Sequence, residues 1–282
     1  MGSPGRFVSL PARGSLAKLC FREYGEPNGF PVIFAHGNLN SRLYAPAWEK
    51  TEEVTKAANV RLIAVDRPGV GGSTPQPGRT YSSFAEDIEV LVDTLGLKRF
   101  GVAGFSSGGP HALAVACEER LGERVSSLSL ISSDAPYKRI GPEMIKRLYG
   151  VENLTAEIAL QNAQTNYDHL KTSYLGMTKE NRRKLAIEDV EEAVKQGLEG
   201  VAADSLLETG DWDFEISNIK SPVTVWHGKA DTDVPVESSR FLVDLFPQTC
   251  QKKINYIEGE SHSMIRRHWN SILEDLVSAS KL

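Results

Sequence analysis

Short apolar runs that each stop at a glycine or a polar residue are the feature that most limits the fold of this chain. The runs are rich in β-branched residues, and amphipathic stretches separate them. Runs of this kind are typical of strands buried on both faces of a parallel sheet. Six of them occur, at residues 31–35, 61–65, 99–103, 125–131, 222–226 and 251–257.

The stretches between the runs have the pattern of helices. Ser82 or Ser83 can cap a helix that Gly96 ends, with one apolar face made by Phe84, Ile88, Leu91, Val92 and Leu95. Strand, helix and strand in succession predict right-handed crossovers. We therefore expect an α/β fold with a mostly parallel, doubly wound sheet of about eight strands. The first 24 residues are expected to add antiparallel strands at one edge.

The strand pattern is interrupted between residues 134 and 217. Glu, Lys, Leu and Ala dominate there, and apolar residues recur at helical spacing. The sequence predicts a helical cap at 134–217, inserted in a core domain made of residues 1–133 and 218–282. A helical insertion over the strand ends is a natural lid. The alternative is a helical elaboration without a gating role.

A serine motif follows the third of the apolar runs. Residues 104–108, Gly-Phe-Ser-Ser-Gly, fit G-x-S-x-G between a strand and a helix. The sharp turn of this motif leaves no room for side chains two residues before and after the serine. Ser106 then projects at the positive end of the next helix, where the backbone amide of Ser107 is a natural oxyanion donor.

A nucleophilic serine needs a base, and the base needs an acid that orients it. His262 lies between the last apolar run and the terminal helix, at the same sheet edge as Ser106. Asp231 or Asp233, after the run at 222–226, supplies the acid in the order Ser, Asp, His, with Asp231 as the choice. Asp134 is the second choice of acid. Structural roles are expected for His111, His169, His227 and His268.

With these motifs the chain resembles the α/β-hydrolase superfamily from about residue 20 to 270. Residues 36–38, His-Gly-Asn, resemble the oxyanion loop of the family. Residues 66–73 resemble its D-x-x-G-x-G-x-S segment, and Asp231 lies in its G-x-x-D-x-x-V-P pattern. Asp66 and Arg67 are interpreted as residues that brace this loop.

The resemblance implies a serine hydrolase of a small or medium carboxylic ester, lactone or thioester. Ser106, Asp231 and His262 are its triad, and the amides of Asn38 and Ser107 are its oxyanion donors. A serine nucleophile argues against the epoxide hydrolases and haloalkane dehalogenases of the family, which use aspartate. A lyase, an acyltransferase or a perhydrolase with the same triad stays open, as does a ligand-binding member with little turnover.

The composition of the chain limits the kinds of partner and cofactor that we expect it to bind. The net charge of −5 argues against nucleic acid and anionic membranes, and no apolar run has the ~18–20 residues of a membrane span. The three scattered cysteines predict neither a disulfide framework nor a zinc site. Without clustered ligands or a phosphate-binding G-x-G-x-x-G, we expect no metal and no organic cofactor. The expected partner is a small-molecule acyl substrate.

The sequence ends in Ser280, Lys281 and Leu282. A C-terminal S-K-L is an address read by the peroxisomal import receptor. No signal-peptide pattern occurs in the first residues. We expect a peroxisomal location if the source is eukaryotic and a cytoplasmic one otherwise.

Overall fold

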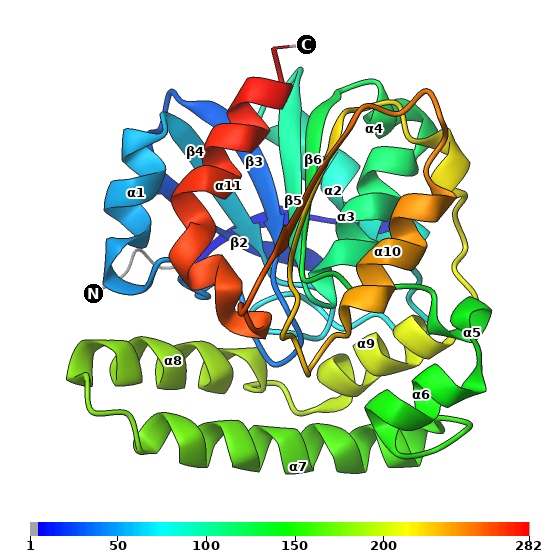
Figure 1. Ribbon diagram of the computed structural model, residues 1–282. Helices are drawn as coiled ribbons and strands as arrows, with labels where there is room; N and C mark the ends of the chain where they lie inside the picture. Colours follow the sequence, from blue (N-terminus) through cyan, green and yellow to red (C-terminus); the bar gives the residue numbers. More distant parts are fainter. Residues whose placement is uncertain (1–4, 282) are drawn as a thin grey trace.

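An eight-stranded sheet crosses the middle of the protein in the computed structural model, which describes residues 5–281 (Figure 1). The strand order is β1-β2-β4-β3-β5-β6-β7-β8. The strands are β1 (Arg6–Ser9), β2 (Lys18–Gly25), β3 (Phe30–Ala35), β4 (Val60–Val65), β5 (Phe100–Phe105), β6 (Val125–Ile131), β7 (Val223–Gly228) and β8 (Lys252–Ile257).

Six of the strands, β3 to β8, pair in parallel. β1 pairs antiparallel with β2, and β2 pairs antiparallel with β4. The mostly parallel sheet of about eight strands and its antiparallel edge are therefore confirmed. Each of the six apolar runs forms one of the parallel strands, with ends that differ by one or two residues from those expected.

Helices cover both faces of the sheet. One face packs against α1 (Thr51–Ala57) and α11 (Ile265–Ala279), and the other against α2 (Tyr81–Thr94), α3 (Gly108–Cys117) and α10 (Val236–Leu245). Side chains alternate along a strand, so neighbouring residues of β3 face opposite sides of the sheet. Phe34 packs with α1 and α11, and Ile33 packs with α2, α3 and α10. The remaining short helices of the core are α4 (Glu119–Gly122) and the 3-10 turns Pro11–Arg13, Trp48–Lys50 and His262–Met264.

The N-terminus of α2 corrects one expectation. Its cap is Thr80, not Ser82 or Ser83: the Thr80 hydroxyl accepts from the Ser83 amide, and the Ser83 hydroxyl accepts from the Thr80 amide. This reciprocal pair satisfies two amides that the first helical turn leaves unbonded. Gly96, after the helix, has a φ of +67°, as expected of a left-handed C-terminal residue.

The segment between β6 and β7 is helical throughout its described elements. It contains α5 (Tyr137–Ile140), α6 (Pro142–Tyr149), α7 (Ala156–Leu175), α8 (Glu180–Ala193), α9 (Glu199–Thr209) and the 3-10 turn Ile216–Asn218. We call residues 134–217 the inserted segment. Its helices α6 to α9 lie together along one edge of the sheet layer, at the bottom of Figure 1.

The helices of the described residues include none that is long and apolar enough to cross a membrane. The last of them, α11, ends at Ala279. Leu282, the final residue of the tripeptide at the end of the sequence, lies outside the described residues, so the expected import signal stays a prediction.

Candidate active site

Ser106 occupies a strained turn between β5 and α3. Its φ is +54°, in the left-handed region that residues with a side chain rarely adopt. Two backbone hydrogen bonds hold it there: its amide donates to the Ile131 carbonyl at 2.9 Å, and its carbonyl accepts from Gly109 at 2.8 Å. Strain of this kind persists only where the surroundings enforce it, and it is often found at active sites.

The glycines around Ser106 are required by close backbone contacts. A β-carbon on Gly104 would lie 2.4 Å from the Gly108 carbonyl oxygen, and one on Gly108 would lie 2.1 Å from the Ala35 carbonyl oxygen. Both distances are far below van der Waals contact. The sequence-based reason for G-x-S-x-G, that small residues must flank the serine, therefore applies to these two positions.

Asp231 and His262 form a hydrogen-bonded pair after β7 and β8. His262 Nδ1 lies 2.8 Å from Asp231 Oδ2. The other oxygen of Asp231 accepts from the amides of Asp233 at 3.0 Å and Val234 at 2.9 Å. Burial would raise the pKa of Asp231, but hydrogen bonds from His227, from His262 and from the Val234 amide hold it well below its usual range. Burial would lower the pKa of His262, but the Asp231 carboxylate raises it.

His227, which was expected to be structural, braces the acid. Its buried ring lies with Nε2 at 2.8 Å from the Val234 carbonyl oxygen and at 3.3 Å from Asp231 Oδ2. Its Nδ1 is hydrogen-bonded to the Ser239 hydroxyl. His227 therefore fixes the loop that carries Asp231. The sequence signal for this role was its place at the end of β7, four residues before the acid.

The histidine lies beside the serine turn without a direct bond to Ser106. The His262 ring packs against the ring of Phe105, the residue before the serine, with 4.9 Å between centroids. Among residues 5–281, Ser106 Oγ and His262 share no hydrogen bond. Catalytic hydrogen bonds are often long in ligand-free sites and tighten when substrate binds. Ser106 is only 9% exposed, so the site is largely covered.

Asp134, the second-choice acid, lies close to the serine but does not bond the histidine. Its amide donates to the Ser106 carbonyl at 3.3 Å, and its carboxyl accepts from the Tyr137 hydroxyl. Burial raises the pKa of Asp134 to about 6. Of the two candidate acids, the structure pairs Asp231 with His262.

Two backbone amides near Ser106 are without acceptors. Within the described chain, nothing accepts from the amides of Asn38 or Ser107, the two residues predicted to bind an oxyanion. The Asn38 side chain donates to the Val201 carbonyl of α9 at 3.4 Å. This contact shows what the side chain does here: it joins the loop after β3 to the inserted segment.

One group of side chains has the composition of a metal site. Ligand atoms of Asp231, Asp233 and His262 lie within 4.8 Å of one another. However, Asp231 and His262 are bonded to each other, and the second Asp231 oxygen accepts from two amides. This arrangement suits an acid that orients a base. The expected absence of a metal and of a cofactor stays a prediction.

Comparison with known proteins agrees with this geometry. A strained serine beside an acid–histidine pair on a mostly parallel sheet defines the class of α/β-fold enzymes with a nucleophilic turn. A sequence model of the family described as alpha/beta hydrolase fold matches residues 31–264. The chain therefore belongs to the α/β-hydrolase fold family.

Relatives of this chain include a peroxidase and an esterase. It is 26% identical to the non-heme chloroperoxidase of Streptomyces lividans, over 93% of this chain and 95% of that protein. It is 24% identical to the pimeloyl-[acyl-carrier protein] methyl ester esterase of Nitrosomonas europaea, over 78% and 85%. The crystal structure of a bromoperoxidase from Bacillus anthracis superposes with a TM-score of 0.72 at 21% identity, over 99% of this chain and 100% of that one.

Proposed function

We propose that this protein is a serine hydrolase that cleaves a small or medium carboxylic ester, or a lactone or thioester, through an acyl-enzyme. One observation carries the proposal: Ser106 lies on a strained turn at the start of α3, next to the hydrogen-bonded pair of Asp231 and His262. Membership of the family and similarity to a methyl ester esterase support hydrolysis of an ester.

In the first step, Ser106 Oγ attacks the acyl carbonyl while His262 Nε2 takes its proton. Asp231 accepts from His262 Nδ1, which fixes the tautomer and stabilises the imidazolium that forms. The raised pKa of His262 agrees with this role, because the neighbouring carboxylate favours the protonated ring.

The carbonyl oxygen becomes negative as the tetrahedral intermediate forms. The unbonded amides of Asn38 and Ser107 donate to it. The intermediate then releases the alcohol, which takes the proton from His262, and leaves the acyl group on Ser106. Water attacks this ester with His262 as the base, releasing the acid and restoring the serine.

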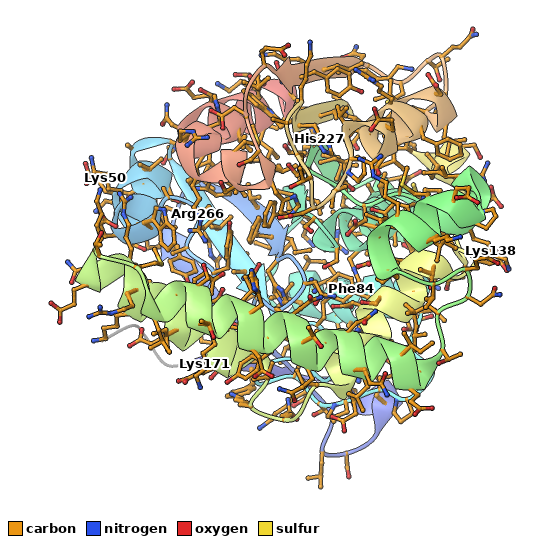
Figure 2. The ribbon with its side chains drawn as sticks, turned by 60° about the horizontal axis from the view of Figure 1, so that its bottom comes forward. Lys50, Phe84, Lys138, Lys171, His227 and Arg266 are labelled. Atoms are coloured by element: carbon orange, nitrogen blue, oxygen red, sulfur yellow. The ribbon has the colours of Figure 1, made fainter. Side chains whose placement is uncertain are left out.

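The inserted segment is proposed to act as the cap, with residues 1–133 and 218–282 as the core domain. Two observations support this role. The α9 carbonyl of Val201 is bonded to Asn38, and Ser106 is largely buried. Seen from the side of the cap, α7, which carries Lys171, crosses in front of the rest of the molecule (Figure 2). A cover of this kind excludes water and shapes the acyl pocket.

The test is hydrolysis of 4-nitrophenyl esters from acetate to palmitate by the parent protein and by Ser106→Ala. We expect the variant to lose at least about 10⁴-fold in turnover, because the nucleophile is gone. The pH at which kcat/KM rises should lie above the ordinary pKa of histidine, because that of His262 is raised. Parent-like turnover by a folded Ser106→Ala would contradict the mechanism.

A second candidate is perhydrolysis at the same site. The similarity to a non-heme chloroperoxidase over 93% of the chain favours it. Hydrogen peroxide would replace water as the attacking group: its oxygen bonds to the acyl carbon, the bond to Ser106 breaks, and a peracid leaves as the serine regains its proton. Ester turnover in added peroxide, with peracid and free acid measured separately, distinguishes the two products. Free acid alone would reject this candidate.

A further inference from the structure

A buried arginine contacts the two residues before Asn38 and the side chain of Ser107. Arg67 follows β4 and is fully buried. Its Nη1 donates to the His36 carbonyl, and its Nη2 lies 3.1 Å from the Gly37 carbonyl oxygen. The same Nη2 lies 3.3 Å from Ser107 Oγ. Since the Gly37 carbonyl and the Asn38 amide belong to one planar peptide group, the contact of the Arg67 guanidinium with this carbonyl helps to set where the Asn38 amide points.

The orientation of Arg67 depends on a carboxylate of the inserted segment. Asp204 of α9 accepts from Arg67 Nη2 at 2.6 Å and from Nε at 3.0 Å, with both ends of the pair buried. Arg79 Nη2 donates to its other oxygen at 2.5 Å. Two-point pairing of this kind fixes the plane of a guanidinium, which a single contact does not.

The carboxylate at this position carries its charge. Burial would raise the pKa of Asp204, but the charges of Arg67 and Arg79 hold it well below its usual range. A neutral side chain of the same shape would leave two guanidinium groups without a counter-charge in a region closed to water. Such groups turn or draw in water to recover solvation. The charge of Asp204 therefore keeps Arg67 aimed at the loop.

Helix α9 also contacts the loops after β3 and β4 directly. The Asn38 side chain donates to the Val201 carbonyl, almost one helical turn before Asp204. The backbone of α9 also lies against the loop after β4, because a β-carbon on Gly200 would lie 2.3 Å from the Gly69 carbonyl oxygen. Helix α9 is thus in direct contact with both the loop after β3, which carries Asn38, and the loop after β4, which carries Arg67.

We propose that Asp204 is a positioning residue for the oxyanion hole. It orients Arg67, and Arg67 in turn holds the carbonyls of His36 and Gly37 and the hydroxyl of Ser107, so that the amides of Asn38 and Ser107 converge on one point. The inserted segment thereby completes the catalytic machinery of the core. This inference rests on the serine-hydrolase function proposed above.

The principal variant is Asp204→Asn, which keeps the shape of the side chain and removes its charge. Displacing an oxyanion donor affects the transition state more than the bound ester. We expect kcat to fall about 10- to 100-fold with KM within about twofold of the parent. Affinity for a trifluoromethyl ketone should fall by the same factor, because its tetrahedral adduct with Ser106 places an oxyanion in the hole.

The matched control is Glu199→Gln, which removes a carboxylate from an exposed position of the same helix. It should leave kcat, KM and ketone affinity at parent values. A folded Asp204→Asn with kcat and ketone affinity within twofold of the parent would overturn the proposal. So would a fall in kcat with no fall in ketone affinity, because the defect would then lie outside the oxyanion hole.

A second variant guards against failure of the first to fold. Arg67→Lys keeps the charge opposite Asp204 but has one nitrogen in place of the three that contact the carboxylate and the two carbonyls. It should show the same loss of kcat and of ketone affinity, and parent values for both would overturn the proposal. Ser106→Ala is measured beside these variants. If it keeps full turnover, the proposed function fails; if it is inactive while Asp204→Asn matches the parent, only the positioning role fails.

Discussion

The sheet and its helices are held together by apolar packing, whereas the inserted segment is joined to the neighbouring loops mainly by hydrogen-bonded carboxylates. On the sheet, Trp269 of α11 packs edge-on against Phe34 of β3 with 5.7 Å between centroids, within a large apolar cluster. The contact of the inserted segment, which we call the seam, joins α8 and α9 to residues 36–42 and 66–79. Apolar packing has no preferred direction, whereas hydrogen-bonded carboxylates fix distances and angles. Directional contacts thus occur where the position of a loop matters for chemistry.

The apolar part of the seam is small, and one of its residues comes from the core domain. Its buried members are mostly short side chains, and one of them, Leu39, belongs to the loop after β3. Leu39 has a φ of +53°, and its side chain packs in one cluster with residues of the inserted helices. The other buried members of this cluster are Val190 of α8, Val201 and Ala202 of α9, and Ala159 and Ala163 of α7, which packs on these two helices.

Two carboxylates of the seam also differ from each other. Asp204 faces two guanidinium groups, and its pKa is held low. Asp189 of α8 accepts from neutral donors: the Ser41 amide at 2.9 Å, the Ser41 hydroxyl at 2.7 Å and the Asn40 side chain at 2.9 Å. Burial raises the pKa of Asp189 to about 7. The two anchors of the inserted segment should therefore respond to pH in opposite directions.

The largest effect on stability is expected from the sheet side of the comparison. Trp269→Ala removes a buried ring and leaves the Thr55 hydroxyl without its donor. We expect the free energy of unfolding to fall by about 3–5 kcal/mol, as measured by urea denaturation. Trp269→Phe, the control, should lose clearly less. A loss below about 1 kcal/mol for the alanine variant would mean that this cluster is not the main source of stability.

The next prediction disturbs the seam without changing a charge. Gly200→Ala places a methyl group 2.3 Å from the Gly69 carbonyl oxygen, so α9 must move away from the loop. We expect a loss of about 1–3 kcal/mol in thermal denaturation, together with lower kcat. Gly176→Ala, whose new methyl group meets its nearest atom at 3.4 Å, is the matched control and should leave both quantities near parent values.

A smaller effect distinguishes the two anchors by pH. A carboxyl whose folded pKa is raised binds more protons folded than unfolded, so its contribution to stability is lost as pH rises through the folded pKa. For Asp189 that loss builds up as the pH rises from the ordinary pKa of aspartate and is complete above about pH 7. In urea denaturation, the stability advantage of the parent over Asp189→Asn should therefore shrink between pH 5 and pH 8, by about 1–2 kcal/mol.

Asp204 provides the opposite sign. Its folded pKa is depressed, so its contribution is present above the unfolded pKa of aspartate and is lost as pH falls below it. The advantage of the parent over Asp204→Asn should stay constant from pH 5 to pH 8. An advantage of the parent over Asp189→Asn that is just as constant would show that the two carboxylates do not differ as described.

The smallest effect is expected at the outer helix of the inserted segment. The Thr155 hydroxyl caps α7 by accepting from the Ile158 amide at 3.3 Å. Thr155→Ala should cost about 0.5–1 kcal/mol in thermal denaturation and leave kcat unchanged, because the seam carboxylates belong to α8 and α9 and not to α7. A fall in kcat comparable to that of Gly200→Ala would place α7 in the machinery as well.

Much of the sheet could be predicted because its physics is local. Each parallel strand is a short apolar run between turn residues, and each run needs to be buried on both faces. The glycines at 104 and 108 were equally readable, since the serine turn excludes side chains there. The α2 cap was misplaced by two or three residues because Thr80, Ser82 and Ser83 all have hydroxyls that can bond an amide.

The contacts of the seam could not be predicted from the same sequence patterns. Asp189 lies in a helix with many charged residues, and Asp204 in a helix whose charged residues are all acidic, so both resemble solvated side chains until their partners are known. Their partners are 125 to 149 residues away along the chain. The available signal was a carboxylate at an apolar position of the helical repeat, such as Asp189 next to the buried Val190. Arg67 was correctly interpreted as a brace, but its counter-charge was not found.

The left-handed backbone of Leu39 has a consequence for how this protein can be recombined with its relatives. A chimera that exchanged only residues 134–217 would separate Leu39 from the helices it packs against and Arg67 from the carboxylate of Asp204. The segment that travels as a unit must include residues 36–42 and 66–79 together with α8 and α9. Crossovers placed outside these ranges should yield folded hybrids more often than crossovers at the two ends of the helical insertion alone.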